Sequence, residues 1–430
     1  MSALASPRVS SLPGPDDITS VVLPNGIHVL ARPNFNSPSV VINGYLQAGG
    51  LQDPDDKLGL AYFAAAALMR GTAKRSFQAL YDALESAGAS LGFQGGTHTT
   101  GFSGKALSED LDLLLGLLAD AVRTPVFPAE QIDRLRAQLL TGLALRAQDT
   151  GDMASLAFDQ MVYDGHPYSR PEDGFPETVQ AITRDDLADF HAVHYGPQGL
   201  VLTVVGAITP DQAVDKVRET FGDWTNLGQP APPPLPAVKP LDELVSRTVN
   251  IPGKSQANVV LGAAGPTRRS DDYLPASLGN SVLGQFGMYG RIGEVVREQS
   301  GLAYYAYSSL GGGVGPGPWQ MNAGIAPENV ERVIALIRAE IERYVREPVT
   351  KDELADTTAN FIGRLPLALE SNGGVAGALL NLTRYELGLD YYQRYAARIA
   401  AITPEEIQIV SSRYLDPDRL AMAVAGSFED

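Results

Sequence analysis

The chain has 430 residues, of which 44% are hydrophobic and 19% are charged, and its formal net charge is -17 at pH 7. This length is enough for two domains of about 200 residues, each with its own core. No run of lysine or arginine is dense enough to follow a phosphate backbone, which argues against nucleic acid and anionic membranes as partners. Because the sequence has no cysteine, disulfides and thiolate metal sites are excluded.

The first 17 residues lack both the basic flank and the apolar core of a signal peptide. The longest apolar run is far shorter than the ~18 residues that span a bilayer. We therefore expect a cytoplasmic protein, or a periplasmic one if a signal peptide has been removed. The negative charge fits a preference for basic peptides, but it fits equally well a role in keeping the protein soluble.

A hairpin and a strand are the first elements that the sequence predicts. Asn25 and Gly26 separate two short apolar stretches, as the tight turn of a hairpin does. A strand is expected over residues 39–47. Four later helices should begin where a threonine is followed three residues on by an acidic residue or glutamine, which is capping-box spacing. These pairs are Thr183 with Asp186, Thr209 with Gln212, Thr350 with Glu353, and Thr403 with Glu406.

Residues 58–69 are apolar all round, which indicates a helix buried in a core. No imidazole, carboxylate or thiolate lies between Tyr62 and Arg70. This stretch therefore has no side chain of the kinds that bind zinc or take a proton from water. A packing role is the simplest interpretation of these residues.

An internal repeat organises the chain. Residues 182–208 and 402–428 agree at an offset of 220, so each half ends with the same helix and strand. Between the halves, residues 228–240 hold six prolines and should form a stiff, extended linker. The chain is therefore predicted to consist of one α+β domain over residues 1–227, the linker, and a second α+β domain over residues 241–430.

The second half contains a helix-to-strand reversal with two polar side chains of functional interest. Gly301 follows residues of helical periodicity and is well placed as the left-handed residue that ends the helix, and residues 302–309 are typical of a strand. Arg297 then lies in the last helical turn and Tyr304 near the start of the strand, so the reversal can bring the two side chains together. Tyr305 should point to the opposite face.

The histidines give only a weak metal signal. His191 and His194 are three residues apart on a predicted helix, near three aspartates, and could bind a metal ion adventitiously. A catalytic site would also need a third ligand and an open coordination position. The second copy of this helix has no histidine at either place, so a structural role is the favoured interpretation.

Residues 59–72, GLAYFAAAALMRGT, resemble the segment GLAHFLEHMLFKGT of the pitrilysin, insulin-degrading enzyme and mitochondrial processing peptidase family of zinc peptidases. The H-x-x-E-H of that family supplies two metal ligands and a general base. Tyr62 and Ala66 stand at the two histidine positions, and Ala65 stands at the position of the base. The third ligand position falls at about Gly142, in a stretch without a carboxylate. The resemblance therefore implies a member of the family that binds no cofactor of its own.

The resemblance covers nearly the whole chain. Residues 284–309 resemble a motif of the same family in which an arginine and a tyrosine seven positions apart face the zinc, and here these are Arg297 and Tyr304. The resemblance implies that the pair holds substrate, with the phenol aimed at the oxygen of the scissile carbonyl. The alternative is structural, with Arg297 complementing the helix dipole or pairing with Glu294, and Tyr304 in the core.

A weaker resemblance concerns the strand that pairs with extended substrate in this family. Residues 88–103 match it in position, but Phe93, Gln94 and several glycines depart from the residues that the family commonly has there. Recognition would consist of adding a peptide strand to a sheet edge.

The resemblance implies two α+β domains, each an antiparallel β-sheet with helices packed on one side, that together form half of a clam-like chamber. We expect the non-catalytic, substrate-binding subunit of a heterodimeric zinc endopeptidase that acts on peptides or unfolded polypeptides. Its partner would be a homologous catalytic subunit with an intact H-x-x-E-H that holds the zinc. A competing interpretation is a scaffold or binding protein, like the core proteins of respiratory complex III. Hydrolysis by this chain alone is a third interpretation, for which the sequence indicates no residues.

Overall fold

The computed structural model describes residues 12–285 and 290–428, and its strands form two sheets of unequal size. Residues 1–11 hold most of the segment used for the signal-peptide prediction and lie outside the described residues, as do residues 286–289 of the motif at 284–309. None of the described helices is long and apolar enough to cross a membrane.

The first sheet has six strands in the order β1-β2-β6-β3-β5-β4, so β1 and β4 are its edges. Its neighbouring strands are antiparallel except for β2 and β6, which run parallel. The predicted hairpin is formed by β1 and β2. The strands are β1 (Thr19–Val22), β2 (His28–Pro33), β3 (Ser39–Leu46), β4 (Ser90–Gly95), β5 (Thr100–Leu107) and β6 (Val201–Gly206). The helices of this half are α1 (Leu60–Ala67), α2 (Phe77–Ser86), α3 (Leu111–Arg123), α4 (Ala129–Arg146), α5 (Thr150–Val162), α6 (Pro176–Ala181), α7 (Arg184–His194) and α8 (Pro210–Phe221).

The second sheet has five strands in the order β7-β11-β8-β10-β9, with one parallel pair, β7 with β11. The strands are β7 (Val245–Asn250), β8 (Ala257–Ala264), β9 (Ala303–Leu310), β10 (Pro318–Ile325) and β11 (Ala421–Gly426). The helices are α9 (Tyr273–Asn280), α10 (Arg291–Gly293), the π-helix η8 (Glu294–Gln299), α11 (Val330–Arg346), α12 (Lys351–Ala368), α13 (Asn372–Arg384), α14 (Tyr391–Ala400) and α15 (Pro404–Tyr414). The two α+β units are thus confirmed, although each sheet is mixed rather than wholly antiparallel.

The internal repeat is visible in single elements. α7 and α15 both have 11 residues, β6 and β11 both have 6 residues, and each pair begins 220 positions apart. All four predicted capping boxes form, each with its threonine at the N-cap. Residues 228–240, the predicted linker, contain no helix or strand.

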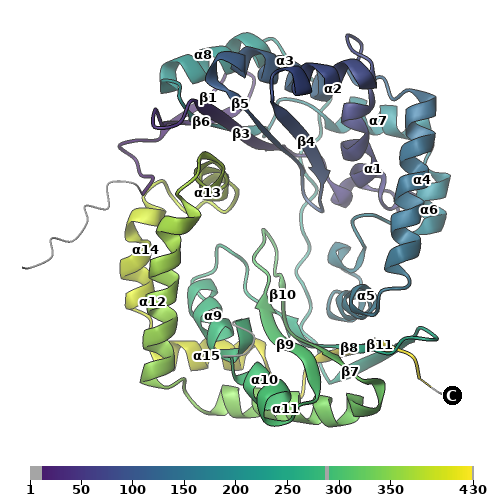
Figure 1. Ribbon diagram of the computed structural model, residues 1–430, viewed down its shortest axis with the longest axis vertical. Coiled ribbons are helices and arrows are strands. Elements are labelled where there is room, and N and C mark those ends of the chain that lie inside the picture. Colours follow the sequence, from purple (N-terminus) through teal and green to yellow (C-terminus); the bar gives the residue numbers. More distant parts are fainter. Residues whose placement is uncertain (1–11, 286–289, 429–430) are drawn as a thin grey trace, which may run out of the picture.

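Each sheet is covered on both faces, and one covering helix comes from the other half of the chain. α13 packs on β3 and β6, where Leu379 shares a buried cluster with Val41 and Val205. α5 packs on β8 and β11, where Phe158 shares a buried cluster with Val260. Figure 1 shows both exchanged helices on the inner faces of the sheets, with α4 and α12 on opposite sides of the molecule.

The predicted helices on one side of each sheet are those of the same half, and the exchanged helix adds a cover on the other face. β6 is buried at every residue and β11 at all but one, so both faces of each strand need an apolar cover. Neither half supplies that cover for its own inner face. Each half therefore uses a helix of the other half to bury the inner face of its sheet.

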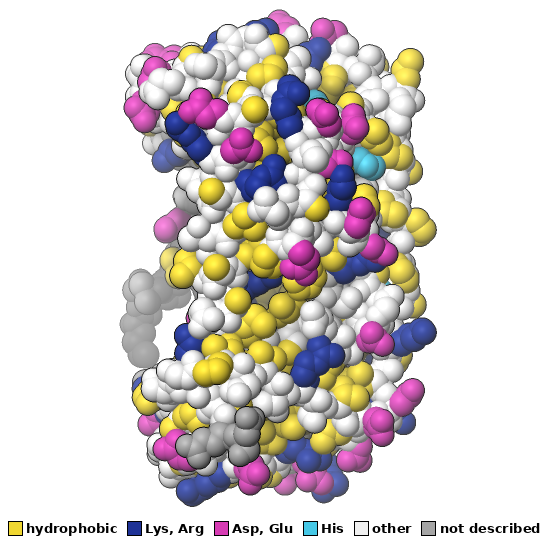
Figure 2. Space-filling view, turned by 90° about the vertical axis from the view of Figure 1, so that its right-hand side faces the viewer, with side chains coloured by type: hydrophobic (Ala, Val, Ile, Leu, Met, Phe, Trp, Pro, Cys, Tyr) yellow, Lys and Arg dark blue, Asp and Glu magenta, His cyan; other side chains and the backbone are white. Residues whose placement is uncertain are grey.

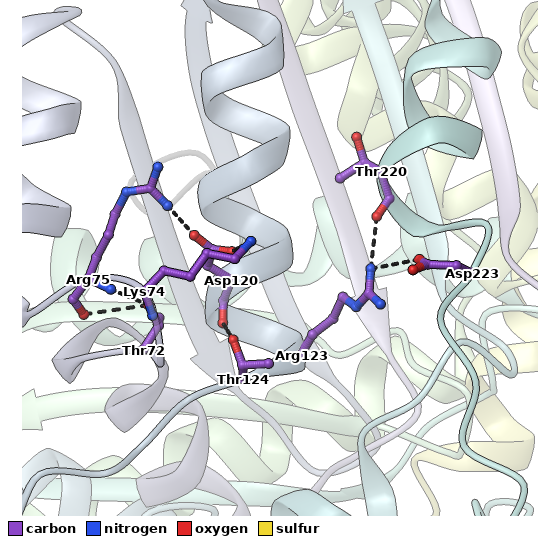
Figure 3. A network of polar contacts seen from close by, with 8 residues as sticks. All are labelled: Thr72, Lys74, Arg75, Asp120, Arg123, Thr124, Thr220 and Asp223. Carbon is purple, nitrogen blue, oxygen red and sulfur yellow. Dashed lines mark hydrogen bonds and ion pairs between the residues drawn. The ribbon is translucent and has the colours of Figure 1, made fainter.

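A buried carboxylate fixes the outer helices of the first half (Figure 3). Asp120 in α3 is 3% exposed. Its carboxylate accepts a hydrogen bond from Arg75 and forms an ion pair with Lys74 at 2.8 Å. In the same helix, Arg123 donates to the carboxylate of Asp223 at 2.9 Å, just beyond α8. The buried and paired Asp120 ties α3 to the segment before α2. On the other side, Arg123 links α3 to Asp223, whose side chain is 77% exposed.

Charges of both signs alternate over the face shown in Figure 2, on the side of α4 and α5 in Figure 1. Hydrophobic side chains gather between the upper and lower halves on the same face. Mixed charges produce no one-sided field, so this face would not attract a polyanion.

Candidate functional site

α1 begins at a turn that a buried aspartate holds in place. The carboxylate of Asp53 accepts the backbone N–H groups of Gly59 and Ala61, each at 2.8 Å. Burial raises the pKa of Asp53 to about 7, although both hydrogen bonds favour the ionised form. The start of the helix is therefore set by a residue outside the motif positions, which is why the helix persists without metal ligands.

The two histidine positions of the family motif lie on one partly exposed strip of α1. Tyr62 and Ala66 are partly exposed, whereas Ala65, at the position of the base, is 1% exposed. The sequence predicts a helix that is buried all round, but the structure leaves one strip of it partly exposed. Tyr62 and Ala66 lie on the same strip because residues four apart share one helix face. Zinc in proteins is bound by imidazole, thiolate and carboxylate groups, so a phenol and a methyl group at these places provide no such set.

Gly142, at the third ligand position, lies on α4 beside α1. The guanidinium of Arg136 in α4 lies 5.3 Å over the ring of Phe63 in α1, and Arg70 donates to Gln138 at 3.0 Å. Apart from its chain neighbours and the backbone of its own helix, no atom lies within 4 Å of the place where a Cβ on Gly142 would be, so this position faces open space. The part of the chain that the structure describes contains no group of three His, Asp or Glu side chains able to hold a metal ion.

His191 has a hydrogen-bond partner, and His194 has an aromatic contact. The Nε2 of His191 lies 2.9 Å from the carbonyl oxygen of Val122, and the ring of His194 packs 4.6 Å from the ring of Phe190. Burial lowers the pKa of both imidazoles. These contacts support a structural role for the two histidines.

The arginine of the second candidate site lies on an irregular helix. α10 is a single turn that continues as the π-helix η8, where the sequence predicted a regular α-helix. Gly301 ends this element as predicted, with a φ of +65° and a hydrogen bond from its N–H to the carbonyl oxygen of Arg297 at 2.9 Å. The side chain of Arg297 is 41% exposed, and its Nε lies 3.6 Å from the carboxylate of Glu298. Glu294, the pairing partner considered above, accepts from a glutamine at 3.1 Å.

The tyrosine of this site occupies a β-bulge at the start of β9. Tyr305 is paired with Gly324 and Ala303 with Ile325, which leaves Tyr304 as the extra residue on β9. Tyr304 is 67% exposed, so the interpretation that places it in the core is wrong. A bulge re-aims a side chain, and here the phenol at the bulge is exposed on an edge strand.

Tyr305 belongs to a polar cluster that joins β9 to the first half of the chain. Its hydroxyl accepts from Asn258 Nδ2, and Asn258 Oδ1 accepts from Thr150 Oγ1 at 2.8 Å. Thr150 is the first residue of the exchanged helix α5. Sequence reasoning missed Asn258 and Thr150, because no local pattern marks a contact between residues 108 positions apart.

The predicted substrate-pairing strand is β4, an edge strand of the first sheet. Its last residue, Gly95, packs so closely on α1 that a Cβ there would lie 2.6 Å from the Cα of Tyr62. This close approach explains one of the glycines that depart from the family pattern. Whether a peptide pairs with this edge stays a prediction.

Comparison with known proteins agrees with this architecture. The family described as insulinase (peptidase family M16) matches residues 29–164, and the family described as the peptidase M16 inactive domain matches residues 181–361. The chain belongs to peptidase family M16.

Three relatives illustrate the range of this family. The chain is 27% identical over 425 residues to an uncharacterized zinc protease of Streptomyces coelicolor, covering 96% of this chain and 90% of that protein. A crystal structure of a peptidase M16 inactive domain from Pseudomonas fluorescens matches with a TM-score of 0.90 and 26% identity, covering 96% of this chain and 98% of that one. Mitochondrial cytochrome b-c1 complex subunit 1 of Rattus norvegicus is 25% identical over 272 residues, which cover 62% of this chain and 55% of that protein.

Proposed function

We propose that this chain is the non-catalytic, substrate-binding subunit of a heterodimeric zinc endopeptidase that acts on peptides or unfolded polypeptides. One contrast carries the proposal. Ala66 offers a methyl group where the family motif has a zinc ligand, while Tyr304 offers a phenol that is 67% exposed on a bulge. The match to an M16 inactive domain supports a role beside a catalytic member of the same family.

Arg297 and Tyr304 are the groups that this chain would contribute. A phenol O–H can donate to the oxygen of a scissile carbonyl, where negative charge develops in the transition state. A guanidinium can hold carbonyl or carboxylate oxygens of the same peptide. Zinc in the partner, held by an intact H-x-x-E-H, would activate the attacking water. Cleavage then needs both chains, which we expect to meet in the cytoplasm.

The test is a mixed assay with the H-x-x-E-H homologue of the same organism. We expect each chain alone to leave an unstructured peptide intact and the mixture to cleave it. Tyr304→Phe should lower kcat of the mixture on the order of 100-fold, because one donor to the oxyanion is lost. Assembly of the two chains, measured by gel filtration, should not change.

Tyr307→Phe is the matched control, since it removes a phenol hydroxyl from the same strand at a residue that is 39% exposed. It should leave kcat unchanged. Stoichiometric zinc in the purified chain, together with peptide cleavage without a partner, would contradict the proposal. Equal activity of Tyr304→Phe and the unmodified chain in the mixture would remove the role given to Tyr304.

A scaffold is the second candidate function. The observation that favours it is the similarity to cytochrome b-c1 complex subunit 1, which is a component of a larger complex. The same mixed assay separates the two functions. A scaffold would assemble with its partners without adding peptidase activity, and Tyr304→Phe would have no effect.

A further inference from the structure

A cavity of about 720 Å³ opens between the two halves of the chain. Its wall includes the β4–β5 turn, residues 168–172, the glycine-rich β9–β10 connection at 311–317, and the end of α13. The exchanged helix α5 also contributes to the wall through Asp159, and Tyr163, directly after this helix, contributes as well. This volume is in the range that holds a small ligand or a short peptide. Because both halves build the wall, the cavity exists only in the assembled fold.

Arg384, the last residue of α13, lines this cavity, and not all of its N–H groups have a hydrogen-bond partner. Its guanidinium lies 4.6 Å over the ring of Tyr45, and its Nη2 donates to Thr99 Oγ1 at 3.4 Å. Its Nε is shielded from solvent and has no hydrogen-bond partner. Among the described residues, no carboxylate forms an ion pair with it. Burial and then the charge of Arg384 lower the pKa of the neighbouring His98, so the imidazole does not compete for an anion.

Asp159 is a second ionisable side chain of the cavity wall that has no ion-pair partner among the described residues. No donor or cation within the described ranges pairs with its carboxylate. Burial raises the pKa of Asp159 to about 7, and no hydrogen bond or cation offsets this effect. A half-buried carboxylate in this state gains free energy when a cation reaches it.

The other ionised groups of the same wall already have partners. Arg170 forms an ion pair with Asp55 at 2.6 Å. Glu172 accepts from the backbone N–H and the hydroxyl of Thr97 at 2.7 Å and 2.6 Å. Within the described ranges, the absence of an ion-pair partner is therefore a feature of Arg384 and Asp159 and not of the cavity wall as a whole.

We propose that this cavity binds a short peptide or peptide end, with a carboxylate of the ligand on Arg384 and a cationic group of the ligand on Asp159. Among the described residues, neither this guanidinium nor this carboxylate has an ion-pair partner, and a ligand that carries both charges would supply one to each. Tyr163 and Tyr168, whose rings meet edge to face at 5.5 Å, add aromatic surface to the same cavity wall. The cation can be an α-amino group or a basic side chain, which the test below separates.

The proposal deepens the function proposed above, because it names a subsite for the same class of substrate. It is tested by binding to the chain alone, without the zinc-bearing partner. If the chain alone does not bind the peptide but the mixture with the partner cleaves peptides, only the subsite is contradicted. If the chain alone binds the peptide but the mixture with the partner is inactive, only the heterodimeric peptidase is contradicted.

The experiment is isothermal titration of the full chain with the tetrapeptide Lys-Ala-Phe-Ala and its blocked forms. Amidation of the C-terminus should weaken binding about 10-fold, because a charge-assisted hydrogen bond is lost. Acetylation of the N-terminus and, separately, replacement of lysine by norleucine identify the group that Asp159 holds. The modification that matters should weaken binding several-fold.

Two substitutions connect these effects to the cavity. In Arg384→Met, which keeps an apolar stem over Tyr45, the free acid and the amide should bind equally. In Asp159→Asn, the peptide whose cationic group has been removed, by acetylation or by norleucine, should bind as well as the unmodified peptide. Arg394→Met is the control, because Arg394 forms an exposed ion pair with Asp390 at 2.8 Å. This variant should still prefer the free acid to the amide and the cationic peptide to the blocked one.

Equal affinity of the unmodified chain for the free acid and the amide would overturn the proposal. So would a folded Arg384→Met chain that still prefers the acid by 10-fold. If Arg384→Met does not fold, the comparison of acid with amide on the unmodified chain still decides the question, and Arg384→Lys, which keeps the charge, should retain part of the preference.

Discussion

The two halves of this chain repeat one unit, yet they differ in how regular the backbone is before their edge strands. In the first half, α2 is a regular helix of 10 residues that precedes β4. In the second half, the π-helix η8 precedes β9, and β9 begins with a bulge at Tyr304. π-Helices and bulges are concentrated at functional sites. The difference supports the proposal that the second half contributes Arg297 and Tyr304 to a shared active site. In the first half, α1 packs in the core and has no zinc ligand at the motif positions.

The largest expected effect comes from reversing this contrast in the first half. A chain with Tyr62→His, Ala66→His and Gly142→Glu should bind one zinc ion, measured by competition with a chromogenic chelator. Tyr62 and Ala66 share one exposed strip and Gly142 faces open space, so new ligands would not displace core side chains. The matched control carries Gly142→Gln instead and should bind zinc about 10-fold more weakly or worse. No zinc binding by the triple variant would break the equivalence of these positions with the family motif.

The second half is stabilised at neutral pH by a carboxylate near α10. Arg291 donates to Glu353 through Nε and Nη2, both at 2.8 Å. Burial alone would raise the pKa of Glu353, but the hydrogen bonds from Arg291 and Thr350 outweigh it and lower the pKa to about 2. This contribution is present above the unfolded pKa of 4.5 and is lost as the pH falls toward 2.

Glu353→Gln should therefore lower the free energy of unfolding by about 2 kcal/mol at pH 7, and the difference should shrink as the pH falls from 4.5 toward 2. Urea unfolding at several pH values measures this. Glu347→Gln, at a side chain that is 62% exposed, is the control and should change little. A loss that is the same at all pH values would mean that the ion pair is not its cause.

The first half should show the opposite sign of pH dependence at Asp159. Because burial raises its pKa from 3.8 to about 7, its favourable contribution is complete below pH 3.8 and is lost as the pH rises through 7. Asp159→Asn should match the unmodified chain near pH 4 and exceed its free energy of unfolding by about 1 kcal/mol at pH 8. Asp133→Asn, at an exposed position of α4, should be neutral. A destabilised Asp159→Asn at pH 8 would show that the carboxylate has a partner.

The smallest expected effect is on the support of the bulge. Tyr305→Phe removes the hydrogen bond to Asn258, which links β9 to α5. If the proposed function holds, kcat of the mixture should fall several-fold with little change in KM, because Tyr304 is less firmly positioned. Unchanged kcat would mean that the bulge does not depend on this cluster.

Local features of the fold were predictable from residues close together in the sequence. The turn at Asn25-Gly26, the four capping boxes and the left-handed Gly301 all formed where the pattern placed them. Each depends on residues within a few positions of one another, so a local pattern is sufficient evidence. The π-helix η8 was not predictable in this way, because its apolar spacing is compatible with an α-helix.

The sequence by itself determined that this chain repeats one α+β unit and that the zinc-ligand positions of its family hold Tyr62, Ala66 and about Gly142. Only the tertiary structure decided that α5 and α13 are exchanged between the halves, and that Arg384 and Asp159 line one cavity. The reason is physical. The residue type at a motif position and the cap of a helix can be read from residues close together in the sequence. The burial of a second sheet face depends on apolar surfaces that meet only after the chain has folded.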